Sequence, residues 1–266
     1  MKIDYKETPN DLLTRIDIHN KFGAQDIDKW MLDTLKLTQG MSILDVACGA
    51  GKQCNSYYNF LKGECEITGG DVSKDLLQQA ISENTKRNSN IKYIELNFNN
   101  HFAFNDNTFD LISCCFAIYY VENVAFTIQE MHRLLKPGGR LFTTGPMPDN
   151  KKLFYDIIHE ATNKPIPPMP GSSRYGSELL DAIKKQFSTV KVEIFNNPLT
   201  FLSVEPYMDY TRASISEDRK LWNTFFDDKD DFENIMKKIE DSAKQRLVRD
   251  GKLVMTKVVG GFFATK

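Results

Sequence analysis

The residues best suited to chemistry lie around one glycine-containing turn. Met41–Gly51, with the sequence MSILDVACGAG, predicts a short apolar strand that ends in this turn and leads into a helix. Backbone amides are exposed at such a helix start, and Gly49 and Gly51 let a ligand approach the main chain closely. Asp45 lies near the carboxyl end of the strand, where ligands bind in open α/β sheets.

A second acid follows the next apolar segment. Ile67–Gly70 predicts another strand, and Asp71 stands at its tip about twenty residues beyond the turn. An acid in this place can accept hydrogen bonds from both hydroxyls of a ribose. The turn and the acid together predict a site for a nucleoside-bearing cofactor. The dinucleotide fingerprint needs a third glycine, and Cys54 takes that place, so the turn alone is also compatible with a purely structural role.

The elements that must position these residues alternate between strands and helices. Apolar runs predict strands at 42–47, 66–71, 91–96, 109–116, 140–144, 189–195 and 253–264. Helical spacing predicts two helices between residues 10 and 37, and others at 51–61, 73–87, 123–135, 150–160 and 177–187. This alternation predicts an α/β fold with a parallel, doubly wound sheet.

Four motifs resemble those of class I S-adenosylmethionine-dependent methyltransferases of the small-molecule type, and they occur in the family's order. LDVACGAG resembles the first motif, and GGDVSKDLLQQA resembles the strand-two acid with its helix. FAFNDNTFDLISCCFAIYYVEN and EMHRLLKPGGRLF match the fourth strand with its outgoing loop and the approach to strand five. The resemblance covers about residues 41–146. It implies a seven-stranded Rossmann-like sheet whose strands six and seven form an antiparallel hairpin at one edge.

Two segments fall outside that common core. We expect a single methyltransferase domain over residues 1–266, with a helical cap at 1–40 and a cofactor-binding core at 41–148. The C-terminal half, 149–266, would carry a helical lid at about 200–250, between strands six and seven. Both segments carry aromatic side chains at helical spacing. They would either close over the cofactor and line the substrate pocket, or cover exposed apolar core.

The resemblance implies cofactor contacts for individual residues. Asp71 would bind the ribose hydroxyls, and Val72 would pack on the adenine. Gly49 and Gly51 would let the backbone pass beside the ribose and the methionine portion.

Other residues would contact the amino-acid end of the cofactor. Carbonyls near Ala47 and Cys115 would accept hydrogen bonds from its ammonium, and Asp45 would add negative charge there. Arg15 and His19 share a helix face because they are four residues apart. Arg15 would either pair with the cofactor's carboxylate or remain a solvated surface residue.

Three places depart from the family's pattern. Asn97–Phe98, or Phe98–Asn99, stands where relatives often carry an acid and a small apolar residue. The alignment of the residues that would contact the adenine therefore stays open by one position. Ala47 replaces a common glycine and fits if its φ is negative. Tyr119 and Tyr120 replace histidines that often follow the fourth strand, and they would either line the methyl-transfer pocket or pack on the first helix.

The resemblance implies methyl transfer from S-adenosylmethionine to a small-molecule acceptor, at N, O or C. The reaction would be an in-line displacement driven mainly by proximity and orientation, so no particular catalytic residue is expected. The alternative is a regulatory or scaffold protein that binds S-adenosylmethionine without transferase activity. A nicotinamide-dependent oxidoreductase is a more distant alternative, which the missing third glycine disfavours.

Composition limits the partners. The sequence is 41% hydrophobic and 26% charged with a formal net charge of −2, as is ordinary for a soluble globular protein. We therefore expect neither nucleic acid nor membrane as a partner, and a cytoplasmic location. The five cysteines form no Cys-x-x-Cys pair, so no metal cofactor is expected. Monomer and homodimer both remain open.

Overall fold

The computed structural model describes residues 8–167, 169–215, 222, 224–225 and 231–266. The chain divides into two compact units. Unit 1 comprises Met1–Asp26, Pro148–Pro170 and Asn196–Val258, and unit 2 comprises Ile27–Met147, Gly171–Phe195 and Val259–Lys266. Unit 2 contains the glycine turn, whereas unit 1 contains most of the segments expected to form the cap and the lid.

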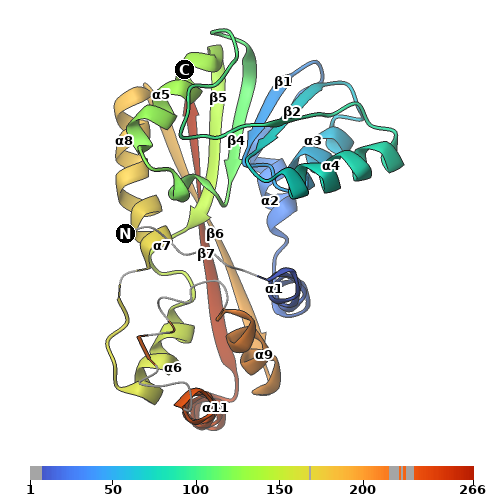
Figure 1. Ribbon diagram of the computed structural model, residues 1–266. Coiled ribbons are helices and arrows are strands. Elements are labelled where there is room, and N and C mark those ends of the chain that lie inside the picture. The colour runs from blue at the N-terminus through green and yellow to red at the C-terminus, as the bar shows by residue number, and fades with distance from the viewer. Residues whose placement is uncertain (1–7, 168, 216–221, 223, 226–230) are drawn as a thin grey trace. The chain divides into compact units, whose positions relative to one another are not determined.

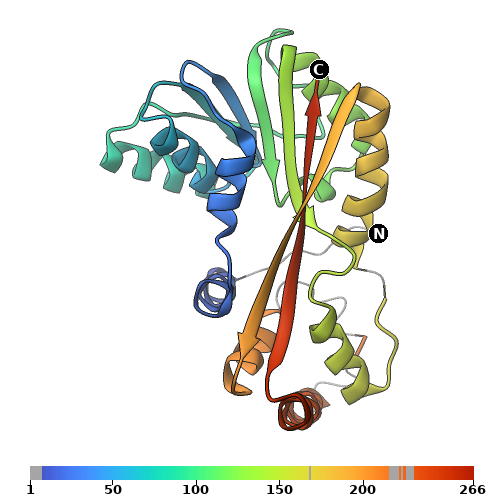
Figure 2. The same cartoon turned by 180° about the vertical axis from the view of Figure 1, so that it is seen from behind.

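The strands form one seven-stranded sheet in the order β3-β2-β1-β4-β5-β7-β6 (Figure 1). The strands are β1 (Ser42–Val46), β2 (Glu66–Asp71), β3 (Lys92–Glu95), β4 (Phe109–Cys115), β5 (Leu135–Pro146), β6 (Thr189–Phe201) and β7 (Leu253–Thr265). β1 to β5 pair in parallel, whereas β7 pairs antiparallel with β5. The arrows of β6 and β7 point in opposite directions (Figure 2). The predicted doubly wound seven-stranded α/β fold is confirmed.

Adjacent strand residues face opposite sides of the sheet, and each side is covered by helices. Leu44 and Ile112 belong to a core with α5 (Val124–Leu134) and α8 (Leu180–Gln186). Their neighbours Ile43 and Leu111 belong to a second core. Residues of α2 (Ile27–Leu35), α3 (Lys52–Phe60) and α4 (Lys74–Arg87) contribute to that second core. The near-continuous apolar runs of β1 and β4 follow from burial on both faces.

Side-chain caps set two helix starts close to the predicted positions 73 and 123. The Ser73 hydroxyl accepts a hydrogen bond from the amide of Leu76 at 3.3 Å, so α4 begins directly after the Asp71 strand tip. The Asn123 side chain accepts from the amide of Phe126 at 3.1 Å and begins α5. These caps fix where each helix leaves the carboxyl edge of the sheet.

Two strands are longer than predicted. β5 begins at Leu135 rather than at residue 140, so residues 136–139 lie inside the strand instead of before it. Phe109 pairs with Leu135 across a bulge, where Gly138 adopts a φ of +77°. β6 continues to Phe201 instead of ending at residue 195. It therefore begins in unit 2 and ends in unit 1.

Unit 1 is built on helices with an aromatic core. Its helices include α1 (Pro9–Phe22), α6 (Lys152–Thr162), α9 (Glu205–Ala213) and α11 (Asp231–Asp250). Phe154, Tyr207 and Trp222 are fully buried in their shared core. The segment between β6 and β7 is thus helical at α9 and α11, and residues 216–221, 223 and 226–230 lie outside the described chain. Within the described residues, no helix has the length and apolar character needed to cross a membrane.

Candidate functional site

The turn after β1 is held by hydrogen bonds to the neighbouring strand. The Cys48 amide donates to the Gly70 carbonyl at 3.1 Å, and the Gly51 amide donates to the Cys48 carbonyl at 3.0 Å. Ala47 adopts a φ of +57° in order to leave β1 in this direction. Ala47 was expected to fit if its φ were negative, and that condition is not met, because the hydrogen bond of Cys48 to β2 determines this dihedral. The left-handed region costs an L-residue about 1–2 kcal/mol.

The two glycines of the turn have different surroundings. Both have positive φ, +55° at Gly49 and +80° at Gly51. A Cβ at Gly51 would overlap the Tyr93 hydroxyl and lie 3.2 Å from the Ala80 Cβ. A Cβ at Gly49 would meet only the Leu76 Cδ1, at 4.0 Å. Gly51 therefore serves the packing of the turn, whereas Gly49 borders open space.

Tyr93 packs against this turn and was not predicted from the sequence. It lies in β3, and its ring also contacts Gly69, where a Cβ would lie 2.8 Å from the Tyr93 Cδ1. Its hydroxyl is buried and has no hydrogen-bond partner among the described residues. An aromatic residue in a strand carries no signal that it will fill the space beneath a turn over forty residues earlier.

Asp71 lies beneath this turn and binds it directly. Its Oδ2 accepts a hydrogen bond from the Gly49 amide, and its Oδ1 accepts one from the Ser73 amide, both at 2.8 Å. The residue is only 8% exposed. Each carboxylate oxygen can accept a further hydrogen bond. Asp71 is thus a rigid acceptor that has capacity for two hydroxyl donors.

An exposed apolar side chain stands beside that acid. Val72 follows Asp71 directly and is 58% exposed, and Leu76 on the first turn of α4 is 37% exposed. Val72 and Leu76 offer apolar surface next to a buried carboxylate and to the open space at Gly49. The juxtaposition fits a ligand with a flat apolar part and a diol.

Asp45 lies within the core beneath the turn. Its Oδ1 accepts a hydrogen bond from the Ser113 hydroxyl at 2.5 Å, and the Cys54 thiol donates to its Oδ2 at 3.5 Å. Burial raises the pKa of Asp45 to about 6, and the charge of Asp71 adds to this shift. At neutral pH the carboxylate is still mainly ionised, so it places a negative charge under the carboxyl ends of β1 and β4.

The end of β4 mirrors the end of β1. Asp45 and Ser113 are in register, which brings Ala47 and Cys115 to the same edge of the sheet. Phe116 adopts a φ of +58°, and its amide donates to the Thr144 carbonyl at 2.9 Å. Burial raises the pKa of the Cys115 thiol, so this cysteine is not a ready thiolate nucleophile.

The loop after β3 is tied to the loop after β4. The Asn97 Oδ1 accepts a hydrogen bond from the Asn99 amide at 2.9 Å, which forms a local turn. The Asn99 Oδ1 in turn accepts from the Glu122 amide at 2.8 Å. The Thr127 hydroxyl donates to the Phe98 carbonyl at 3.0 Å. The Asn97 side-chain oxygen is therefore engaged locally, which is compatible with adenine recognition by backbone groups of this loop.

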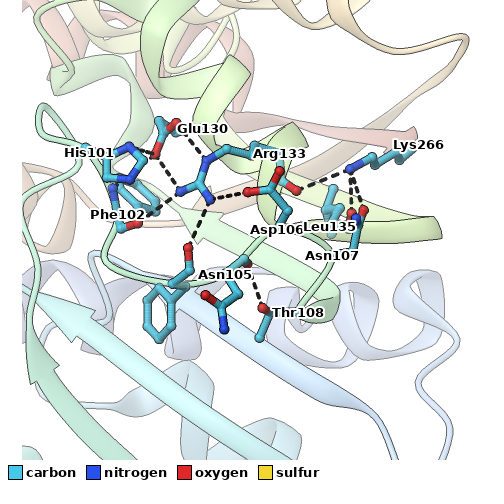
Figure 3. Close-up of polar contacts among 11 residues, drawn as sticks. His101, Phe102, Asn105, Asp106, Asn107, Thr108, Glu130, Arg133, Leu135 and Lys266 are labelled. Atoms are coloured by element: carbon cyan, nitrogen blue, oxygen red, sulfur yellow. Dashed lines mark hydrogen bonds and ion pairs between the residues drawn. The ribbon is translucent and has the colours of Figure 1, made fainter.

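A charged network fixes the remainder of that loop (Figure 3). The Arg133 guanidinium donates to both oxygens of Glu130, to Asp106 at 2.7 Å, and to carbonyls at 102 and 104 at 2.9 Å. His101 contacts Glu130 at 2.9 Å. The hydrogen bond from Arg133 holds the pKa of Glu130 below its ordinary value.

The remaining predicted residues lie on η1 and on α1. Tyr119 and Tyr120 follow β4 in the short helix η1 (Ile118–Tyr120), with ring centroids 4.6 Å apart. Tyr119 is only 9% exposed. Arg15 lies on α1 in unit 1, whereas the other predicted site residues lie in unit 2. Its contact with a cofactor therefore stays a prediction. Within the described residues, no group of three or more His, Cys, Asp or Glu side chains is arranged to hold a metal ion.

Comparisons with known proteins agree with this architecture. Residues 44–143 match the family described as a methyltransferase domain. Demethylmenaquinone methyltransferase of Geobacillus sp. (strain WCH70) is 33% identical over 117 residues, which cover 42% of this chain and 50% of that protein. The enzyme of the same name from Listeria monocytogenes serovar 1/2a is 30% identical over 118 residues, or 42% of this chain and 49% of that protein. The chain thus spans about half the length of the curated relatives it matches.

Solved structures show the same fold. The YcgJ protein of Bacillus subtilis matches with a TM-score of 0.57 at 14% identity, over 90% of this chain and 97% of that one. A putative methyltransferase of Bacillus halodurans C-125 matches with a TM-score of 0.57 at 16% identity, over 90% and 98%. At such identities the likeness concerns the fold alone.

Proposed function

We propose that this chain, whose residues 44–143 match the family described as a methyltransferase domain, is a class I S-adenosylmethionine-dependent methyltransferase that transfers the methyl group of that cofactor to a small-molecule acceptor. The observation that carries the proposal is the hydrogen bond between Asp71 and the glycine turn. The Asp71 carboxylate accepts from the Gly49 amide at 2.8 Å and lies next to the open space at Gly49 and the exposed Val72.

Each part of this edge suits one part of S-adenosylmethionine. The remaining lone pairs of Asp71 would accept the two ribose hydroxyls, and Val72 would cover one face of the adenine. The loop at Asn97–Asn99, held by Glu122 and Thr127, would reach the adenine edge through Asn97 or the Phe98 backbone.

The amino-acid end of the cofactor would lie toward β1 and β4. Carbonyls near Ala47 and Cys115 would accept hydrogen bonds from its ammonium, and the ionised Asp45 would stabilise that charge from below. Arg15 would pair with the cofactor's carboxylate.

The cofactor supplies an electrophilic methyl group on a sulfonium, so the chain need only bind it, exclude water and orient the acceptor. The α1 helix and the helical segment between β6 and β7 would form the cap and lid of a single methyltransferase domain and enclose the acceptor. The acceptor would be a small molecule that reacts at N, O or C. The curated relatives make demethylmenaquinone the first acceptor to test.

Two measurements on the full chain test this proposal. We expect S-adenosylhomocysteine to bind in titration calorimetry, and we expect a methyl group to pass from labelled S-adenosylmethionine to one member of a panel of amines, phenols and reduced quinones. Binding without transfer to any acceptor would instead favour a regulatory or scaffold protein. Binding of a nicotinamide dinucleotide in preference to S-adenosylhomocysteine would refute the cofactor assignment.

A further inference from the structure

One arginine holds the loop that follows β4. Arg174 ends α7 (Pro170–Arg174), and its Nη1 donates to the carbonyl of Tyr119 at 3.1 Å and to the carbonyl of Val121. Its Nη2 lies 3.4 Å from the carbonyl of Glu122. The same guanidinium pairs with Glu178, with 2.8 Å between Nε and Oε2. The Arg174 side chain thus donates hydrogen bonds to three backbone carbonyls of the segment 119–122.

The residue next to this arginine is anchored firmly on the sheet. The Tyr175 ring lies against two glycines, since a Cβ at Gly145 or Gly260 would stand 2.6 or 3.1 Å from its atoms. The ring stacks on Phe262 with centroids 4.3 Å apart. Its hydroxyl donates to the Thr143 carbonyl at 2.8 Å. Tyr175 therefore fixes the backbone from which Arg174 projects.

The helix widens at this anchor. Tyr175–Leu179 forms a π-helical turn between α7 and α8. Such turns are rare and frequently occur at functional sites. Arg174 directly precedes this π-helical turn. Its guanidinium contacts carbonyls of η1 and the following loop, which lie more than fifty residues earlier in the sequence.

The loop that Arg174 holds carries the tyrosine pair. Tyr119 packs edge-on against Tyr175, with centroids 6.3 Å apart, and lies beside Gly171. The Glu122 amide also binds Asn99, so the same loop braces the segment after β3. The position of the tyrosine rings at the carboxyl edge of β4 thus depends on a helix that follows β5.

We propose that Arg174 is a positioning residue for methyl transfer, which holds the carbonyls at 119–122 and thereby orients Tyr119 and Tyr120 at the acceptor side of the site. This inference rests on the proposed function, because the rings face an acceptor only if the cofactor binds at this edge. Arg174 itself need not touch the acceptor or the cofactor. Its effect should therefore be larger in turnover than in cofactor affinity, which it can reach only through the hydrogen bond from the Glu122 amide to Asn99.

The experiment compares Arg174→Gln and Arg174→Lys with a matched control in the full chain. Glu178→Gln removes the charge of the ion-pair partner and leaves the carbonyl contacts in place. We expect Arg174→Gln to lower kcat/KM for the acceptor about 10- to 100-fold, because small misplacements of orienting groups cost this much. Arg174→Lys should fall between it and wild type, since one ammonium cannot replace the planar fork. Glu178→Gln should match wild type in kcat/KM and should bind S-adenosylhomocysteine within about twofold of wild type. The two Arg174 variants should lose less affinity for S-adenosylhomocysteine than they lose in kcat/KM.

Hydrogen exchange supplies a readout that needs no acceptor. In Arg174→Gln the amides of Tyr120, Val121 and Glu122 should exchange faster, while those of residues 43–71 should be unchanged. Unchanged exchange at 120–122, or unchanged kcat/KM despite faster exchange, would overturn the inference. An equal loss of cofactor affinity and turnover would also overturn it, because that pattern indicates general destabilisation. Absence of turnover in wild type would count against the proposed function, while the exchange result would still decide whether Arg174 holds the loop.

Discussion

Alanine at Gly51 and alanine at Gly49 should have different consequences, although both glycines belong to one turn. Gly51 has a φ of +80° and Gly49 a φ of +55°, so either substitution places an L-residue in the left-handed region. That conformational cost is about 1–2 kcal/mol at each site. The steric cost arises only at Gly51, whose new Cβ would overlap the Tyr93 hydroxyl and press on Ala80.

Overpacking of this kind adds about 1–3 kcal/mol, so Gly51→Ala should destabilise the fold by about 2–5 kcal/mol in total. Gly49→Ala should cost only about 1–2 kcal/mol, because its Cβ enters open space. That open space is where the cofactor would approach. Gly49→Ala should therefore weaken cofactor binding more than it weakens the fold, and Gly49→Val should weaken binding further.

Urea unfolding measures the first effect, and calorimetric titration with S-adenosylhomocysteine measures the second. Tyr93→Phe provides a matched test, because it removes the hydroxyl that Gly51→Ala would strike. The double variant Gly51→Ala with Tyr93→Phe should regain part of the stability lost in Gly51→Ala. Equal destabilisation by the two alanines, or wild-type cofactor affinity in Gly49→Val, would refute this account of the turn.

Three further predictions concern the core, a loop and the cap. Asp45→Asn should raise the free energy of unfolding by up to about 3 kcal/mol at neutral pH. The folded pKa of about 6 exceeds the ordinary value of 3.8, so the stability of wild type falls as pH rises between these two values. A gain that urea unfolding finds as large at about pH 4 as at pH 7 would contradict this prediction. The pKa of Glu130 is lowered, so its contribution to the free energy of unfolding is present above the ordinary pKa of 4.5 and is lost as pH falls further. Arg133→Met should reduce the free energy of unfolding at neutral pH by about 2–4 kcal/mol and should flatten this acid dependence. Arg87→Ala, at an exposed ion pair, should change the free energy of unfolding by less than about 0.5 kcal/mol. S-adenosylhomocysteine should slow hydrogen exchange in α1 or in α9–α11 if these segments form the cap and lid, and protection confined to residues 43–120 would mean that they only cover core.

The sequence predicted the parts of the fold that depend on neighbouring residues. The strand before Ala47, the acid at the end of β2 and the helix start near Ser73 are local patterns, and the structure contains each of them. The alternation of strands and helices predicted a doubly wound sheet, and the structure covers both faces, with Leu44 and Ile112 in one core and Ile43 and Leu111 in the other.

The features that the sequence did not predict depend on distant contacts. The positive φ of Ala47 follows from the backbone hydrogen bond between Cys48 and Gly70. The early start of β5 follows from the pairing of Leu135 with Phe109. Tyr93 reaches the turn from β3, and Arg174 reaches η1 from a helix that follows β5. No periodicity or motif in the sequence marks such contacts, because they arise only when the strands are assembled.

The most direct test of the central claim is a calorimetric cycle that pairs Asp71→Ala with a change in the ligand's ribose. We predict that wild type binds S-adenosylhomocysteine and that removing both ribose hydroxyls from the ligand costs wild type about 3 kcal/mol or more, as for two charge-assisted hydrogen bonds. In a folded Asp71→Ala protein the same change in the ligand should cost little, because the acceptor is gone. Equal losses in wild type and variant would contradict the claim that Asp71 binds the ribose of the cofactor.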